Sequence, residues 1–148
     1  ISHRRKLVFF FNFIFFDQGS LSMKKILSIV PRWFPALLIM IVIFAFSSQP
    51  KNNLPDFLNW DYFIKKGAHA IGYGLLALSY LHALKWNKKY YVLAWLLALA
   101  YAVTDEFHQS FVPGRNASIR DVLVFDNLGA LFALFVHYLY RRKYEKEN

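Results

Sequence analysis

The stretch YYVLAWLLALAYAVTDEFHQSFVPGR, residues 90–115, passes from an apolar run directly into a block of polar residues. Residues 90–104 have the composition of a membrane-spanning helix, and we expect that helix to continue through the Asp–Glu pair that follows. Ionisable groups in a span are costly and normally face protein or a water-filled cavity. The stretch therefore indicates both a membrane helix and a polar site at its end.

The composition of the whole chain agrees with a place in a bilayer. The 148 residues are 57% hydrophobic and 20% aromatic, which is more than a soluble domain of this length can bury. The absence of cysteine excludes thiol nucleophiles, Cys-ligated zinc and disulfides. The net charge of +9 is explained by the enrichment of Lys and Arg in cytoplasmic loops, so we expect no nucleic-acid partner.

Four apolar segments are candidate spans. They are residues 26–46, 68–84, 90–104 and 119–140. The connections are short except for residues 47–67, where Pro and Asn predict irregular structure. The sequence thus predicts an all-α, polytopic membrane protein, a bundle of four transmembrane helices with short loops.

Basic residues set the orientation, because Lys and Arg accumulate in cytoplasmic loops. In a four-span bundle one side would carry both termini and the basic residues Lys24, Lys25, Lys85, Lys88, Lys89, Arg141, Arg142, Lys143 and Lys146. We expect that side, with the N and C termini, to be cytoplasmic. The predicted location is the bacterial cytoplasmic membrane, crossed several times.

The sequence near the N-terminus predicts where the transmembrane domain begins. Met23 is followed by two Lys and an apolar segment, a pattern typical of a bacterial start. The apolar run of residues 7–16 is too short to cross a hydrocarbon core, which takes about 20 residues. We therefore expect residues 1–22 to be a non-native or disordered extension and residues 23–148 to form the transmembrane domain.

Polar residues near the ends of the four predicted spans converge on the outer face. Lys66, His69 and Tyr73 are spaced by three and four residues and share one helix face. Asp105 and Gln109 share another face, four residues apart. The Pro-Gly turn that follows would fold an Arg back over the helix ends.

These residue types suit binding and catalysis. His69 or Glu106 could act as general base, and Asp105 could orient a histidine. An Arg or Lys could contact a carboxylate or a lipid phosphate. The residues expected to bind a ligand are Lys66, Tyr73, Gln109, Arg115, Asp121, Ser48 and Gln49.

Other interpretations stay open. Lys66 could be an anchor that extends to lipid headgroups, and the histidines could be packing residues. Metal-ligand atoms are present on His69, Asp105, Glu106 and His108. No tight zinc motif such as two His four residues apart occurs, so we expect no metal and no cofactor. Close helix packing explains the small residues Gly72, Gly74, Gly129 and Ala133.

Several motifs occur in an order that resembles one family. They are Ser47-Ser48-Gln49-Pro50, then Lys66, His69 and Tyr73, then Asp105, Glu106, Gln109, Pro113, Gly114, Arg115 and Asp121. This pattern resembles the VanZ-like membrane proteins over residues 23–140. The resemblance implies an association with low-level resistance to the lipoglycopeptide teicoplanin for the namesake, and no established biochemical role for most members.

One spacing departs from the family pattern. The family usually has an acidic residue or Asn four positions after the last Asp, with Gly three further on. Here Asp126 comes five after Asp121, and Gly129 follows three later. Five residues rotate a regular helix away from the shared face. Either a one-residue bulge restores the register, or Asp126 or Asn127 faces a different helix.

Three functions fit the sequence. The first is an outer-face site that binds or acts on an amphiphilic envelope lipid or a lipid-linked ligand. The second is a membrane-embedded hydrolase or transferase, with Ser47 or Ser48 as nucleophile only if the end of the first span lies beside His69. The third is a structural protein whose polar cluster only clamps helix ends together.

Overall fold

The computed structural model describes residues 31–53, 58–115 and 117–147. The chain divides into two compact units, residues 1–31 and 32–148, and the description that follows concerns the second. Within the described residues every regular element is helical, which confirms the all-α prediction. The predicted extension of residues 1–22, together with Lys24, Lys25 and the start of the first predicted span, lies outside the described residues.

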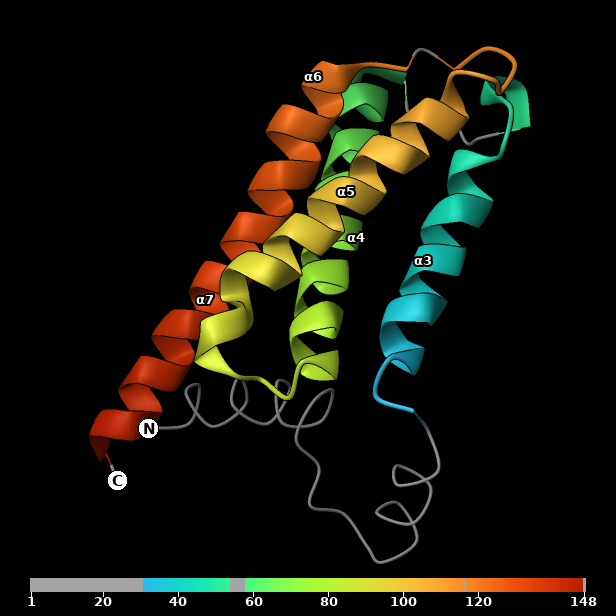
Figure 1. The fold of residues 1–148 in the computed structure, drawn as a ribbon. Helices are drawn as coiled ribbons and strands as arrows, with labels where there is room; N and C mark the ends of the chain where they lie inside the picture. The colour runs from blue at the N-terminus through green and yellow to red at the C-terminus, as the bar shows by residue number, and fades with distance from the viewer. Residues whose placement is uncertain (1–30, 54–57, 116, 148) are drawn as a thin grey trace, which may run out of the picture. The chain divides into compact units, whose positions relative to one another are not determined.

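Four long helical segments make up this unit (Figure 1). They are α3 (Phe34–Ser47), α4 (Asp61–Ala83), α5 (Tyr91–Gln109) and a continuous helix formed by α6 (Ile119–Asp121), η4 (Val122–Asp126) and α7 (Asn127–Glu147). Short 3₁₀ turns, η1 (Lys51–Asn53), η2 (Leu58–Trp60) and η3 (Lys88–Tyr90), lie in the connections. As predicted, α5 continues beyond the apolar run through the acidic pair.

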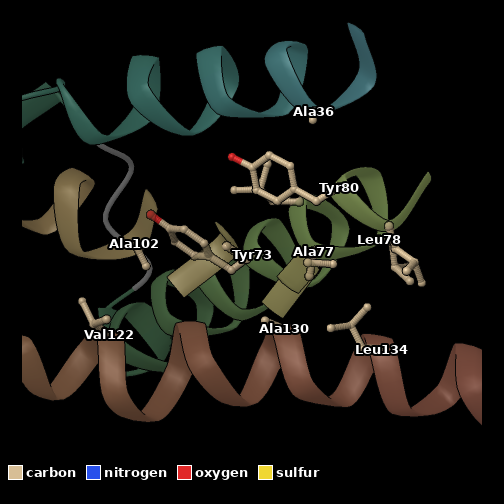
Figure 2. Packing of buried hydrophobic residues seen from close by; sticks show 13 residues of the cluster. Ala36, Tyr73, Ala77, Leu78, Tyr80, Ala102, Val122, Ala130 and Leu134 are labelled. Atoms are coloured by element: carbon tan, nitrogen blue, oxygen red, sulfur yellow. The ribbon is translucent and has the colours of Figure 1, made fainter. Parts of the chain in front are cut away.

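Helix α4 is the centre of the packing and contacts α3, α5 and α7. Its Tyr73, Leu76 and Leu81 are among the most deeply buried side chains of the described residues. From α7, Ala130 and Leu134 pack toward α4, while Tyr80 of α4 lies toward α3 (Figure 2). The core therefore consists of α4 surrounded by its three neighbours.

Small residues let α5 approach α4 closely. Ala94, Ala98 and Ala102 recur every four residues and are all buried, so they form one stripe on the helix. The next position of that stripe is Glu106, which is also buried. Because Glu106 continues the buried face of α5, the packing of this face against α4 also turns Glu106 toward the protein interior.

The tightest helix contact joins α4 to α7. A Cβ atom built on Gly129 would overlap the carbonyl oxygen of Ala70, so the two backbones touch at this point. One turn further, a Cβ atom on Gly74 would lie 3.2 Å from the Cβ of Ala133. Ala70 and Gly74 thus face Gly129 and Ala133 as two pairs of small residues spaced by four, the arrangement that permits close helix approach.

The last helix contains a π-helical turn at η4, between α6 and α7. A π-turn accommodates one more residue than an α-helical turn, because its hydrogen bonds run from residue i to i+5. Asp121 precedes this turn and Asp126 closes it. The structure therefore contains the bulge that the five-residue spacing between these two Asp residues had suggested.

By length and composition, one helix among the described residues could cross a bilayer, Ile119–Lys146, and Phe34–Ser47 is a shorter apolar helix. The predicted second and third spans fall on α4 and α5, whose ends carry the polar residues described below. The four-span topology and the cytoplasmic termini remain predictions.

The α4–α7 contact predicts the effect of adding one methyl group. Gly129→Ala should destabilise the protein by about 1–3 kcal/mol, since the new Cβ would overlap the Ala70 carbonyl and force the helices apart. Gly67→Ala in α4 is the matched control, because its Cβ would meet no atom within 4 Å. It should be neutral or stabilising by up to about 1 kcal/mol. Thermal unfolding in detergent measures both; equal midpoints would contradict the contact.

Candidate functional site

Four helix ends meet at one end of the described unit, drawn at the top of Figure 1. They are the C-terminal ends of α3 and α5, the N-terminal part of α4 and the beginning of the last helix. Side-chain contacts link all four, and they fall into three groups. We call the whole set the polar cluster: Ser47, Ser48, Lys66, His69, Tyr73, Asp105, Glu106, His108, Gln109, Arg115, Asp121 and Asp126.

The first group is centred on Asp105, which is buried. Its Oδ2 accepts hydrogen bonds from Ser47 Oγ at 2.7 Å, Tyr73 OH at 3.1 Å and Gln109 Nε2 at 2.9 Å. Gln109 Nε2 also lies 3.2 Å from Ser47 Oγ. One carboxylate oxygen thus ties α3, α4 and α5 together. Charge-assisted bonds of this kind are stronger than neutral ones and offset part of the cost of burying the carboxylate, whose Oδ1 has no hydrogen-bond partner among the described residues.

The second group is the ion pair between Lys66 of α4 and Asp121 of α6. The rings of Tyr62 and Phe125 flank the Lys66 ammonium, with centroids 5.8 and 5.7 Å away. Cation–π contacts at such distances add to the ion pair. The ammonium is therefore engaged on several sides and joins the start of α4 to the start of the last helix.

The third group pairs His69 of α4 with Asp126 at the end of the π-turn. His69 Nδ1 lies 3.3 Å from Asp126 Oδ1. The Asp126 side chain is 2% exposed, whereas that of His69 is 24% exposed. The buried carboxylate therefore lies beside a partly exposed imidazole, although Asp126 Oδ1 has no well-formed hydrogen bond among the described residues.

The π-turn explains how both pairs form at once. Lys66 and His69 lie three residues apart on one face of α4. In a regular helix their two Asp partners, five residues apart, would point in different directions. Because the π-turn takes up the extra residue, Asp121 and Asp126 share a face and meet Lys66 and His69 respectively.

The loop after α5 brings Glu106 and Arg115 to the same end. Gly114 has φ = 73° and follows Pro113, while Arg115 N bonds to Val112 O at 3.1 Å, so the predicted Pro-Gly turn is present. Arg115 is half-buried, and its Nε is buried without a hydrogen-bond partner in the part of the chain that the structure describes. The backbone N–H of Ser118 donates to Glu106 Oε1.

The two serines at the C-terminal end of α3 both make hydrogen bonds. Ser47 is held by the Asp105 group, and Ser48 Oγ donates to Phe44 O at 2.7 Å and lies 3.0 Å from His108 Nε2. With its only hydrogen on Phe44 O, the Ser48 hydroxyl acts as acceptor toward His108. This geometry does not activate Ser48 as a nucleophile. The predicted ligand-binding residue Gln49 is exposed, and its amide contacts Ala45 O at 3.5 Å, outside the cluster.

Some contacts of the polar cluster serve to hold the helix ends together. The Asp105 group and the Lys66–Asp121 pair link helix ends, although Asp105 Oδ1 is buried without a hydrogen-bond partner among the described residues. His69 likewise joins α4 to the last helix through Asp126, and Glu106 of α5 accepts from the backbone N–H of Ser118, directly before α6. No group of three or more His, Asp and Glu residues in the described ranges is arranged to hold a metal ion.

Fold and cluster define an all-helical protein with a partly buried polar site where its helix ends meet. A family model described as VanZ/LLP1 matches residues 5–141, so the chain belongs to the VanZ/LLP1 family, as the motifs had predicted. Comparison with curated proteins and with solved structures gives no match.

Asp126 was not among the residues predicted for the site, and the structure brings it to His69. The available signal was the five-residue spacing from Asp121, which is compatible with a shared face only if the helix contains a bulge. His108 and Ser47 likewise join the cluster through contacts between helices, which spacing along one helix does not indicate.

The π-turn predicts that two similar deletions differ in effect. Removing exposed Leu123 should convert the turn to regular α-helix, keep Asp121 and Asp126 on one face and change stability by about 1 kcal/mol or less. Removing exposed Leu128, beyond the turn, should rotate Gly129 away from Ala70 and cost roughly 3 kcal/mol or more. Equal losses of the thermal midpoint would show that the extra residue is not absorbed at this turn.

Proposed function

We propose that the chain spans a bilayer four times, with the polar cluster at the outer face and both termini in the cytoplasm. Large apolar side chains on the outward faces of the helices support this placement, among them Ile41 and Phe46 on α3, Val103 on α5 and Phe132 on α7. Soluble monomers rarely expose so much contiguous apolar surface. The opposite end carries the basic turn and the basic C-terminal helix, as expected for a cytoplasmic side.

At the outer face we infer a site that binds or acts on an amphiphilic envelope lipid or a lipid-linked ligand. The observation that carries this inference is the His69–Asp126 pair, because it joins α4 to the last helix and still leaves the imidazole partly exposed beside a buried carboxylate. At leaflet depth its neighbours would be lipid headgroups. Membership of the VanZ/LLP1 family supports an association with glycopeptide resistance.

Arg115 supplies the complementary charge for such a ligand. Arg115 directly follows the Pro-Gly turn and is half-buried, and its Nε has no hydrogen-bond partner among the described residues. A planar guanidinium can bind a phosphate or carboxylate through two parallel hydrogen bonds. Lys66, by contrast, is engaged by Asp121 and two aromatic rings, so its proposed part is to hold the site together.

Binding at this site predicts loss of function without loss of stability. In cells whose teicoplanin susceptibility depends on the protein, His69→Gln and Arg115→Gln should each return susceptibility to that of cells without it, at equal expression and an unchanged thermal midpoint. Lys51→Gln, at an exposed cation on the same end, is the control and should have no effect. If the cluster only holds the helices together, a variant will change teicoplanin susceptibility only when it also lowers the thermal midpoint.

A second candidate function, hydrolysis or group transfer at the outer leaflet, is favoured by the contact between the buried Asp126 carboxylate and the partly exposed His69 ring. A carboxylate behind an imidazole stabilises the charged ring when it takes a proton, as in other His–carboxylate pairs. Ser47 and Ser48 are engaged elsewhere, so the nucleophile would be water or a ligand hydroxyl. Arg115 would then stabilise negative charge that develops on the substrate.

If the site is catalytic, loss of His69 should lower lipid turnover while lipid binding persists. For protein reconstituted in vesicles of phosphatidylethanolamine and phosphatidylglycerol, lipid turnover should fall by roughly 100-fold or more in His69→Ala, the usual range for a general base. Asp126→Asn should lower turnover less, while lipid binding persists in both variants. Mass spectrometry of the extracted lipids measures the products. Turnover that is absent from the unmodified protein, with binding intact, would restrict the site to binding.

A further inference from the structure

The end of the unit opposite the polar cluster is firmly built. After α4, Lys85 and Trp86 adopt left-handed backbone conformations, with φ of 62° and 54°. Trp86 N bonds to Leu81 O at 2.9 Å, and Arg141 Nη1 donates to Trp86 O at 2.6 Å. The Trp86 ring stacks on His137 with centroids 4.7 Å apart. The α4–α5 turn is thus fixed to α7.

An apolar groove of about 350 Å³ lies beside this turn, between α5 and α7. Val92 and Trp95 line it from α5, and Leu131, Leu134 and Phe135 line it from α7. Its volume is within the range of small-molecule sites, about 300–1,000 Å³. Lys88 lies at the end of the groove nearest the turn.

Polar contacts bound the groove at both ends. Trp95 Nε1 donates to Asn127 Oδ1 at 2.8 Å, and Lys88 pairs with Glu145 at the other end. Tyr91 OH lies 2.6 Å from His137 Nδ1, so this hydroxyl is also occupied. The walls therefore offer little to a polar group, and whatever fills the groove must be mainly hydrocarbon with any charge near Lys88.

The basic surroundings of Lys88 favour a negatively charged group in whatever molecule occupies the groove. The α4–α5 turn and the last residues of the chain, 85–89 and 141–148, contain seven Lys and Arg and two Glu. The Lys88 ammonium has three N–H groups, and Glu145 does not occupy all of them. Basic pockets between membrane helices on the cytoplasmic side suit anionic lipid headgroups, because that leaflet carries the anionic lipids.

We propose that the groove between α5 and α7 binds one acyl chain of an anionic phospholipid of the inner leaflet, with its phosphate at Lys88. This site is separate from the polar cluster and does not depend on what the cluster binds. It rests only on the proposed placement of the chain in a bilayer. The lipid would fill the gap between the two helices and bridge the basic turn and the end of α7.

Trp95 is a built-in reporter for this proposal. The full chain is reconstituted in phosphatidylcholine vesicles, and either phosphatidylglycerol or phosphatidylcholine with brominated chains is added as quencher. The emission of Trp95 is obtained by subtracting the fluorescence of the Trp95→Phe variant from that of the unmodified protein. We expect brominated phosphatidylglycerol to quench Trp95 at a several-fold lower mole fraction than brominated phosphatidylcholine.

Variants separate a site from the general lipid layer. Val92→Phe, which fills the groove, and Lys88→Gln, which removes the charge, should each abolish the preference for phosphatidylglycerol. Val103→Phe is the control, on the same helix, exposed and outside the groove. Equal quenching by the two lipids, or a preference that survives both groove variants, would overturn the lipid site. No quenching by either lipid would overturn the bilayer placement as well.

Discussion

The close approach of α4 and α7 is the constraint on which the polar cluster depends. Where Gly129 meets the backbone of Ala70, no side chain separates the two helices. The residues that precede this contact on the two helices are therefore within reach of each other, and Lys66 and His69 meet Asp121 and Asp126. A separation larger by even one methyl group would lengthen both contacts, because packed interiors do not deform continuously. The small residues thus serve the chemistry of the site as well as the packing of the helices.

Within the cluster, some polar atoms have partners and others are buried without one. Asp105 Oδ2 receives three hydrogen bonds from three helices, and the Lys66 ammonium meets a carboxylate and two rings. Among the described residues, Asp105 Oδ1, Asp126 Oδ1 and Arg115 Nε are buried without a hydrogen-bond partner. Leaving such atoms unpaired costs free energy, so the cluster is not optimised for stability alone. In the proposed site, a ligand headgroup would contact the partly exposed His69 side chain, and its apolar part would remain in the bilayer.

Much of this architecture could be predicted from the sequence, and the parts that could not have physical causes. Apolar runs and helical spacing predicted α4, α5 and the last helix, and the Pro-Gly pair predicted the turn before Arg115. The partners of Asp105 could not be predicted, because they depend on the rotation of three helices about their axes. The π-turn was one of two alternatives, since a spacing of five residues does not reveal where a helix absorbs the extra residue. Gln49 lies past the end of α3 and is exposed, so its place in the site stays a prediction.

The position of Asp126 opposite His69 carries the whole account of the site, and cross-linking in membranes tests it directly. The chain has no native cysteine, so His69→Cys can be combined with Asp126→Cys or, as the neighbouring register, with Asn127→Cys. A short thiol-specific cross-linker should join the first pair and leave the second unjoined, because Asn127 is bound to Trp95 of α5. Preferential cross-linking of the second pair, or of neither, would contradict the π-turn register and the site built on it.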